Sequence, residues 1–209
     1  MTIKDFGTQV ENVWAGLRPR TQKLIVGAMQ SAQVNNSSLS NSNFNRSFFY
    51  DAHADWELCR LLKVLDERAS QTEAQKSPQN LSEIRKMADV CARVLTTQTE
   101  SAEAFIQLAT RALKRFDFAA IDKLADILNA RYSAGEVAEI ARQTELAAVR
   151  ALAMESLAQF PTTRLIPLFD DPLYAEIAQN ALEQQAIEYE STEARQLLEE
   201  LAFEDMLGD

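Results

Sequence analysis

The chain has 209 residues, of which 46% are hydrophobic and 25% are charged, and its formal net charge is −10 at pH 7. Two Cys and one His exclude a disulfide framework, a four-ligand zinc site and a two-His metalloprotease motif within the chain. Five scattered Gly exclude a local phosphate-binding loop and a dinucleotide-binding fingerprint.

The charge is distributed unevenly along the chain. Residues 160–209 carry two basic and 12 acidic side chains, which would repel a phosphate backbone, so we expect no nucleic-acid partner. The N-terminal stretch contains Asp5 and has no apolar core, and the longest aliphatic run, 24–29, is far shorter than a membrane span. We therefore expect a soluble, cytoplasmic protein that does not associate with membranes.

Apolar residues recur at helical spacing from end to end, and no stretch alternates as a strand would, which predicts an all-α protein. Thr8-x-x-Glu11 predicts a capping box for the first helix, and Pro19 predicts the first turn of a second.

The segment 34–46 is rich in Asn and Ser and predicts a loop. It would separate an N-terminal helical pair, 1–33, from a helical-repeat-like domain, 47–209, although a single domain remains an alternative.

A third helix is expected over 47–69, a polar linker over 71–79, and a fourth helix capped by Asn80. The apolar stripe of the third helix, which we expect to be buried, consists of Phe49, Ala52, Trp56, Cys59 and Leu62. Cys91 lies on the equivalent stripe of the fourth helix, so both cysteines are predicted to be buried.

A fifth helix is expected over about 101–115, and Asp117 and Ser133 predict the N-caps of two more. The apolar phase slips near Thr144, which predicts a break there. Further on, the sequence predicts a short helix and then a second helix that is capped by Asp171 and begins at Pro172.

The C-terminal third, about 145–205, resembles HEAT and HEAT-like repeats. In these repeats an Asp-x-x-Pro-type turn precedes a helix that carries apolar-Arg, Ala and Ala-Leu. The residues that carry the resemblance are Tyr174, Ala178 and Ala181-Leu182, then upstream Val149-Arg150, Ala153 and Ser156-Leu157, and downstream the segment 191–201. The two matches are 25 residues apart, and Ala175 stands where the family has Arg. The resemblance implies an irregular α-solenoid, an array of helical hairpins.

The stretch 50–59 has the greatest variety of reactive side chains. On a helix, Asp51 and Asp55 share one face and His53 and Glu57 share another. Such a group could hold a metal or act as acid and base, but acids in a first helical turn also stabilise the helix dipole. We expect no metal and no other cofactor, and keep these four residues as an alternative metal or ligand site.

The leading functional hypothesis is a non-catalytic protein–protein interaction or scaffold module, because stacked hairpins present an extended surface. Its candidate partner-binding residues are the acids Glu183, Glu193, Glu199 and Glu200, which suit a basic protein partner or self-association into a homo-oligomer. The alternatives are a helical-bundle enzyme or ligand-binding protein that uses His53 with nearby carboxylates, and a HEAT-like DNA-repair enzyme, which the C-terminal acids oppose.

Overall fold

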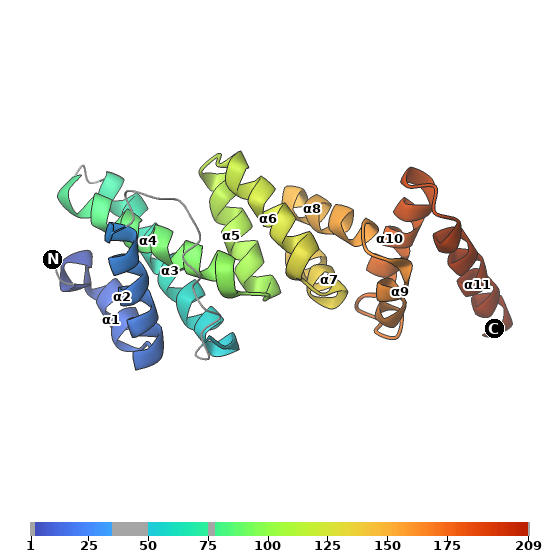
Figure 1. Cartoon of the computed structure of the whole chain (residues 1–209), viewed down its shortest axis with the longest axis horizontal. Coiled ribbons are helices and arrows are strands. Elements are labelled where there is room, and N and C mark those ends of the chain that lie inside the picture. The colour runs from blue at the N-terminus through green and yellow to red at the C-terminus, as the bar shows by residue number, and fades with distance from the viewer. Residues whose placement is uncertain (1–2, 35–49, 75–77, 209) are drawn as a thin grey trace. The chain divides into compact units, whose positions relative to one another are not determined.

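The computed structural model describes residues 3–34, 50–74 and 78–208 (Figure 1). These ranges hold eleven α-helices and two short 3-10 helices and no strand, which confirms the all-α prediction. Apart from Val34, the predicted loop 34–46 lies outside the described residues, as does Phe49. The loop and its role as a domain boundary therefore stay predictions.

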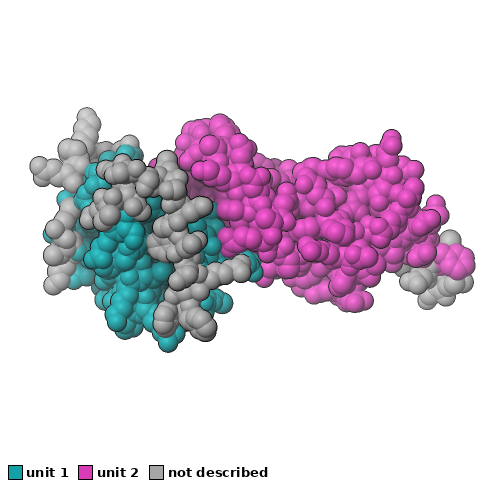
Figure 2. Space-filling view, viewed as in Figure 1, with its two compact units in different colours: residues 1–104 teal, residues 105–209 magenta. Residues whose placement is uncertain are grey.

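The chain divides into two compact units, residues 1–104 and residues 105–209 (Figure 2). Unit 1 contains η1 (Ile3–Phe6), α1 (Thr8–Ala15), α2 (Pro19–Val34), α3 (Ala52–Ala74) and α4 (Pro78–Gln98). Unit 2 contains α6 (Phe118–Arg131), α7 (Ala134–Gln143), α8 (Ala147–Ala158), α9 (Thr162–Leu165), η2 (Ile166–Leu168), α10 (Ala175–Glu188) and α11 (Thr192–Gly208). The border falls in the first turn of α5 (Ala102–Lys114), so most of α5 belongs to unit 2.

Unit 1 is built around α3 and α4, which lie side by side along much of their length. The large side chains that they bury completely are Leu58, Leu61, Leu62, Leu65, Ile84, Met87 and Leu95. The helix α1 packs against α3, and α2 packs against both α3 and α4. The segment η1 is attached through the Arg68 Nε, which donates a hydrogen bond of 2.9 Å to the Phe6 carbonyl.

Unit 2 is a series of neighbouring helices. The helix α8 packs against α7, α6 and α10, and α10 packs in turn against α11. A buried Gln185 on α10 donates to the Phe160 carbonyl at 2.6 Å and accepts from the Thr162 hydroxyl at 3.2 Å. These bonds fix the start of α9 against α10, because an unpaired buried amide would be costly.

Four of the predicted helix boundaries are confirmed. Pro19 lies in the first turn of α2, as predicted. The Asp117 side chain accepts the Ala120 N–H at 3.1 Å and caps α6, and the Ser133 hydroxyl accepts the Glu136 N–H at 3.2 Å and caps α7. The predicted break also lies at Thr144, which ends α7.

Other boundaries were wrong. Gly7 rather than Thr8 is the N-cap of α1, and its positive φ of 104° explains why glycine stands there. Helix α3 continues to residue 74, and α4 begins at Pro78, so the expected linker is mostly helical and Asn80 caps nothing. Helix α10 begins at Ala175, after a turn in which the carbonyl of Asp171 accepts the N–H of Ala175 at 3.0 Å.

None of the helices within the described ranges is both long enough and apolar enough to cross a bilayer.

Candidate functional site

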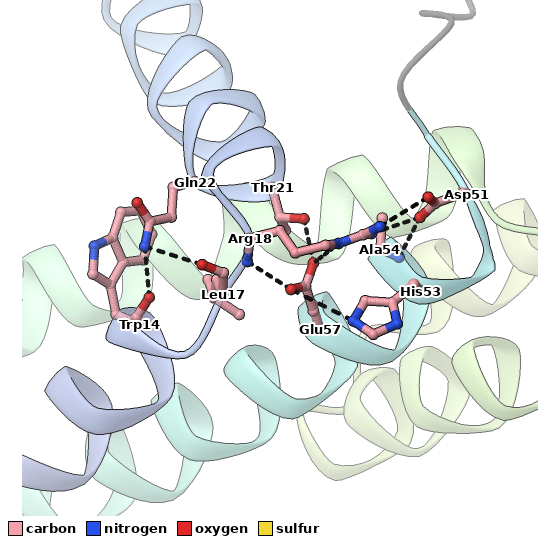
Figure 3. A network of polar contacts seen from close by, with 9 residues as sticks. All are labelled: Trp14, Leu17, Arg18, Thr21, Gln22, Asp51, His53, Ala54 and Glu57. Carbon is pink, nitrogen blue, oxygen red and sulfur yellow. Dashed lines mark hydrogen bonds and ion pairs between the residues drawn. The ribbon is translucent and has the colours of Figure 1, made fainter.

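The reactive stretch 50–59 begins at the N-terminus of α3, where it meets the connection between α1 and α2 (Figure 3). The link is Arg18, which comes directly before the first residue of α2. Its two terminal nitrogens donate to both oxygens of Asp51, at 2.9 and 2.6 Å, and its Nε donates to Glu57 at 3.2 Å. One guanidinium group thus joins two carboxylates of the predicted site.

Glu57 has a side chain that is only 1% exposed, and its carboxylate faces the first turn of α2. It accepts the backbone N–H of Arg18 at 2.7 Å and the hydroxyl of Thr21. A carboxylate at this end of a helix satisfies donors that lack intrahelical partners and stabilises the helix dipole. Burial by itself would raise the pKa of Glu57, but the hydrogen bonds from Thr21 and Arg18 outweigh burial and hold it below its usual value.

Asp51 is the N-cap of α3, since its side chain also accepts the Ala54 N–H at 2.9 Å. The hydrogen bonds from Arg18 hold the pKa of this exposed carboxyl well below its usual range. Asp55 has a different partner and accepts a hydrogen bond from the Tyr50 hydroxyl. Partial burial raises the pKa of the Asp55 carboxyl.

His53 is exposed, and its Nε2 lies 3.8 Å from a Glu57 oxygen, so the predicted i, i+4 pair does form. The four side chains do not surround one point, and nowhere in the described part of the chain do three His, Cys, Asp or Glu side chains form a group that could hold a metal. Both oxygens of Glu57 accept hydrogen bonds. These hydrogen bonds connect the start of α2 to α3.

The sequence analysis missed Arg18 and Thr21, the partners of Glu57. Only the position of Arg18 beside Pro19, at a predicted helix start, hinted at a polar role, and nothing in the linear sequence pairs it with a residue 39 positions away.

Trp56 corrects another expectation. Its side chain is 49% exposed, whereas the apolar stripe predicted burial. It lies between His53, with ring centroids 5.6 Å apart, and Arg60, whose guanidinium is 5.5 Å from the ring centroid. The stripe residues Cys59 and Leu62 are buried as predicted, and Leu58, Leu61 and Leu65 complete the buried face of α3.

Both cysteines are buried, as predicted, and neither forms a disulfide. Burial raises the pKa of Cys59 to about 12, so this thiol stays protonated near neutral pH and is a poor nucleophile.

The acids proposed for partner binding, Glu183 on α10 and Glu193, Glu199 and Glu200 on α11, are all exposed. Glu183 accepts a hydrogen bond of 3.0 Å from Gln179 one turn earlier.

Two arginines in unit 2 occupy equivalent positions. Arg150 is the fourth residue of α8, and its Nε donates to the carbonyl of Ala141, nine residues earlier in α7, at 3.4 Å. Arg195 is the fourth residue of α11, and its Nε donates to the carbonyl of Ala186, nine residues earlier in α10, at 3.1 Å. Each arginine satisfies a carbonyl in the last turn of the preceding helix. In the predicted HEAT-like register Arg150 corresponds to Ala175, whereas in its bond to the preceding helix it resembles Arg195. A terminal nitrogen of Arg150 also donates to the Thr144 carbonyl at 2.6 Å, and that of Arg195 to the Ala186 carbonyl at 2.9 Å.

Comparison with known proteins gives no relative: no family model, no curated protein and no solved structure matches the chain significantly.

Proposed function

We propose that the chain is a non-catalytic helical-repeat protein that binds another protein, and that α7–α8 and α10–α11 are two of its repeats. The observation that carries the proposal is the recurrence of the arginine-to-carbonyl bond, at Arg150 and again at Arg195. The interval of 45 residues falls within the period of about 40–47 residues of HEAT and armadillo repeats.

Buried apolar residues recur at the same interval. The pairs are Val137 with Leu182, Ala141 with Ala186, and Val149 with Ala194. A repeat buries its apolar face against its neighbours, so inner positions should recur as these do.

The acidic outer surface of the last two helices favours a basic partner. Its exposed carboxylates are Glu183, Glu193, Glu199 and Glu200. Basic side chains are few there: residues 160–209 contain only Arg164 and Arg195, and Arg195 is bonded to a backbone carbonyl. A single-sign surface of this kind accelerates encounter with a partner of opposite charge and makes binding sensitive to salt.

The test begins with affinity capture from the native host at low salt, followed by calorimetry with the identified partner. The variant Glu193→Lys, Glu199→Lys, Glu200→Lys should bind at least about tenfold more weakly. A control with the same change in charge, Glu67→Lys, Glu103→Lys, Glu145→Lys, should bind as the parent does, because these exposed acids lie elsewhere. Equal binding by the triple variant, or no partner at all, would contradict the proposal.

A further inference from the structure

The turn between α5 and α6 presents two phenylalanines to solvent. Phe116 is 79% exposed and Phe118 is 64% exposed. The turn is held by backbone bonds from the Phe116 N–H to Leu113 at 3.1 Å and from the Asp117 N–H to Ala112 at 3.0 Å, the pattern of a Schellman motif. The two aromatic side chains therefore project from an ordered backbone.

Phe116 has a φ of 54°. It occupies the left-handed position after the helix, where glycine is usual and a bulky residue is strained. Strain of this kind is kept where a side chain has a role other than stability.

Basic residues surround the two phenylalanines. Lys114 and Arg115 directly precede them and are exposed, and on α6 the exposed Asp122 and Lys123 lie side by side. Asp117 is the one acid between the aromatic rings in sequence, and its carboxylate caps α6. Lys114, Arg115, Phe116 and Phe118 are called the basic turn below.

The turn between α10 and α11 has the opposite charge. Ile187 is 77% exposed and Tyr189 is 47% exposed, and each is followed by an exposed acid, Glu188 and Glu190. Glu190 is the other non-glycine residue with a positive φ, 52°, among the described residues. Ile187, Glu188, Tyr189 and Glu190 are called the acidic turn. Since α6 packs on α8, α8 on α10 and α10 on α11, the two turns belong to opposite ends of this series of helices.

We infer that the basic turn of one copy of the chain docks on the acidic turn of a second copy, in a head-to-tail contact. This inference rests on the proposed function and names a second copy as the basic partner. Each turn exposes two large side chains beside two charges of one sign, although the Tyr189 hydroxyl donates to Glu155 and Glu188 accepts from Gln184 within the chain. The contact would bury the exposed faces of these side chains and pair Lys114 and Arg115 with Glu188 and Glu190. A heterologous contact leaves a free turn at each end, so chains longer than two can form at high concentration.

The contact should be weak. Two turns bury less than the roughly 1,200 Å² typical of stable complexes, so association is expected between about 10 µM and 1 mM. Two copies of net charge −10 also repel each other. The Debye length of about 8 Å at physiological salt screens that repulsion while paired charges in contact still interact. Since the long-range repulsion is already largely screened at physiological salt, a further rise to about 0.5 M mainly weakens the contact charge pairs, and association should be stronger at about 0.1 M than at 0.5 M.

The test is sedimentation equilibrium of the full chain over this concentration range. Phe116→Gly should weaken association at least about tenfold, since it removes a phenyl group that the contact would bury. The change also relieves the strained φ, so loss of folding would not explain the result. The control Lys23→Glu, Lys63→Glu changes two exposed lysines in unit 1 and should associate as the parent does.

A mixing experiment tests the pairing itself. The variant Lys114→Glu, Arg115→Glu and the variant Glu188→Lys, Glu190→Lys should each be monomeric alone. Mixed in equal amounts they should associate again, because the unchanged acidic turn of the first variant meets the unchanged basic turn of the second, and the two reversed turns are complementary as well. A parent chain that is monomeric throughout, or a mixture that stays monomeric, would overturn the inference.

The outcomes separate this inference from the proposed function. If the chain is monomeric but captures another protein through Glu193, Glu199 and Glu200, the inference fails and the proposed function stands. If it is monomeric and captures nothing, both fail.

Discussion

Replacing Glu57 by alanine tests whether its carboxylate holds unit 1 together. Three donors would lose their acceptor: the Arg18 N–H, the Arg18 Nε and the Thr21 hydroxyl. Each net hydrogen bond contributes about 1 kcal/mol. The Thr21 hydroxyl is buried, so it would stay without an acceptor. The Arg18 guanidinium is partly exposed and stays bonded to Asp51, so water can replace the bond that it loses to Glu57. We expect Glu57→Ala to lower the free energy of unfolding by about 2–3 kcal/mol and Glu57→Gln, which keeps one acceptor, by about 1–2 kcal/mol.

The assay is urea unfolding followed by tryptophan fluorescence. The chain has two tryptophans, Trp14 and Trp56, and both lie in unit 1, so the signal reports on that unit alone. With a slope of about 1–3 kcal/mol per molar urea, Glu57→Ala should lower the midpoint by about 1–3 M at unchanged slope.

The control for this experiment is Glu67→Ala, an exposed residue on the same helix, which should change stability by less than about 0.5 kcal/mol. If Glu57→Ala shifts the midpoint no more than Glu67→Ala does, the carboxylate does not fasten α2 to α3.

Four further predictions follow from the described contacts. The pKa of Glu57 is lower in the folded chain than its usual value near 4.3. The contribution of the Glu57 carboxylate to stability is therefore complete above that pH and is lost as the pH falls below it. Between about pH 5 and 3, the stability of Glu57→Gln, followed by fluorescence, should fall less steeply than that of the parent. Arg150→Met and Arg195→Met should lower thermal stability by similar amounts, about 1–2 kcal/mol each, whereas an effect confined to one would count against their equivalence. Phe116→Gly should stabilise unit 2 by about 0.5–1 kcal/mol in circular dichroism melts, and a destabilised variant would mean that the phenyl group packs within the chain. Cys59 should react with a thiol reagent only in denaturant, and rapid labelling of the native chain at pH 8 would contradict its burial.

Local chemistry was sufficient for much of the fold. Helical periodicity predicted the helices, and the caps at Asp117 and Ser133 were correct because each side chain bonds an amide three residues further on. Where two starts were available locally, as at Thr8 and at Asp171, the sequence could not choose. Propensity alone also could not show that the polar stretch 71–74 continues α3.

The sequence by itself determined that the chain is helical, that both cysteines are buried and that negative charge gathers at its end. Only the tertiary structure decided which partners the charged side chains have. The sequence did not show the partners of Glu57, and folding brings Arg18 and Thr21 to it from 39 and 36 residues away. The bonds of Arg150 and Arg195 to carbonyls of the preceding helices likewise appear only in the folded chain. The physical reason is that periodicity and capping act over three or four residues, whereas burial and pairing of a charge depend on segments that only folding brings together.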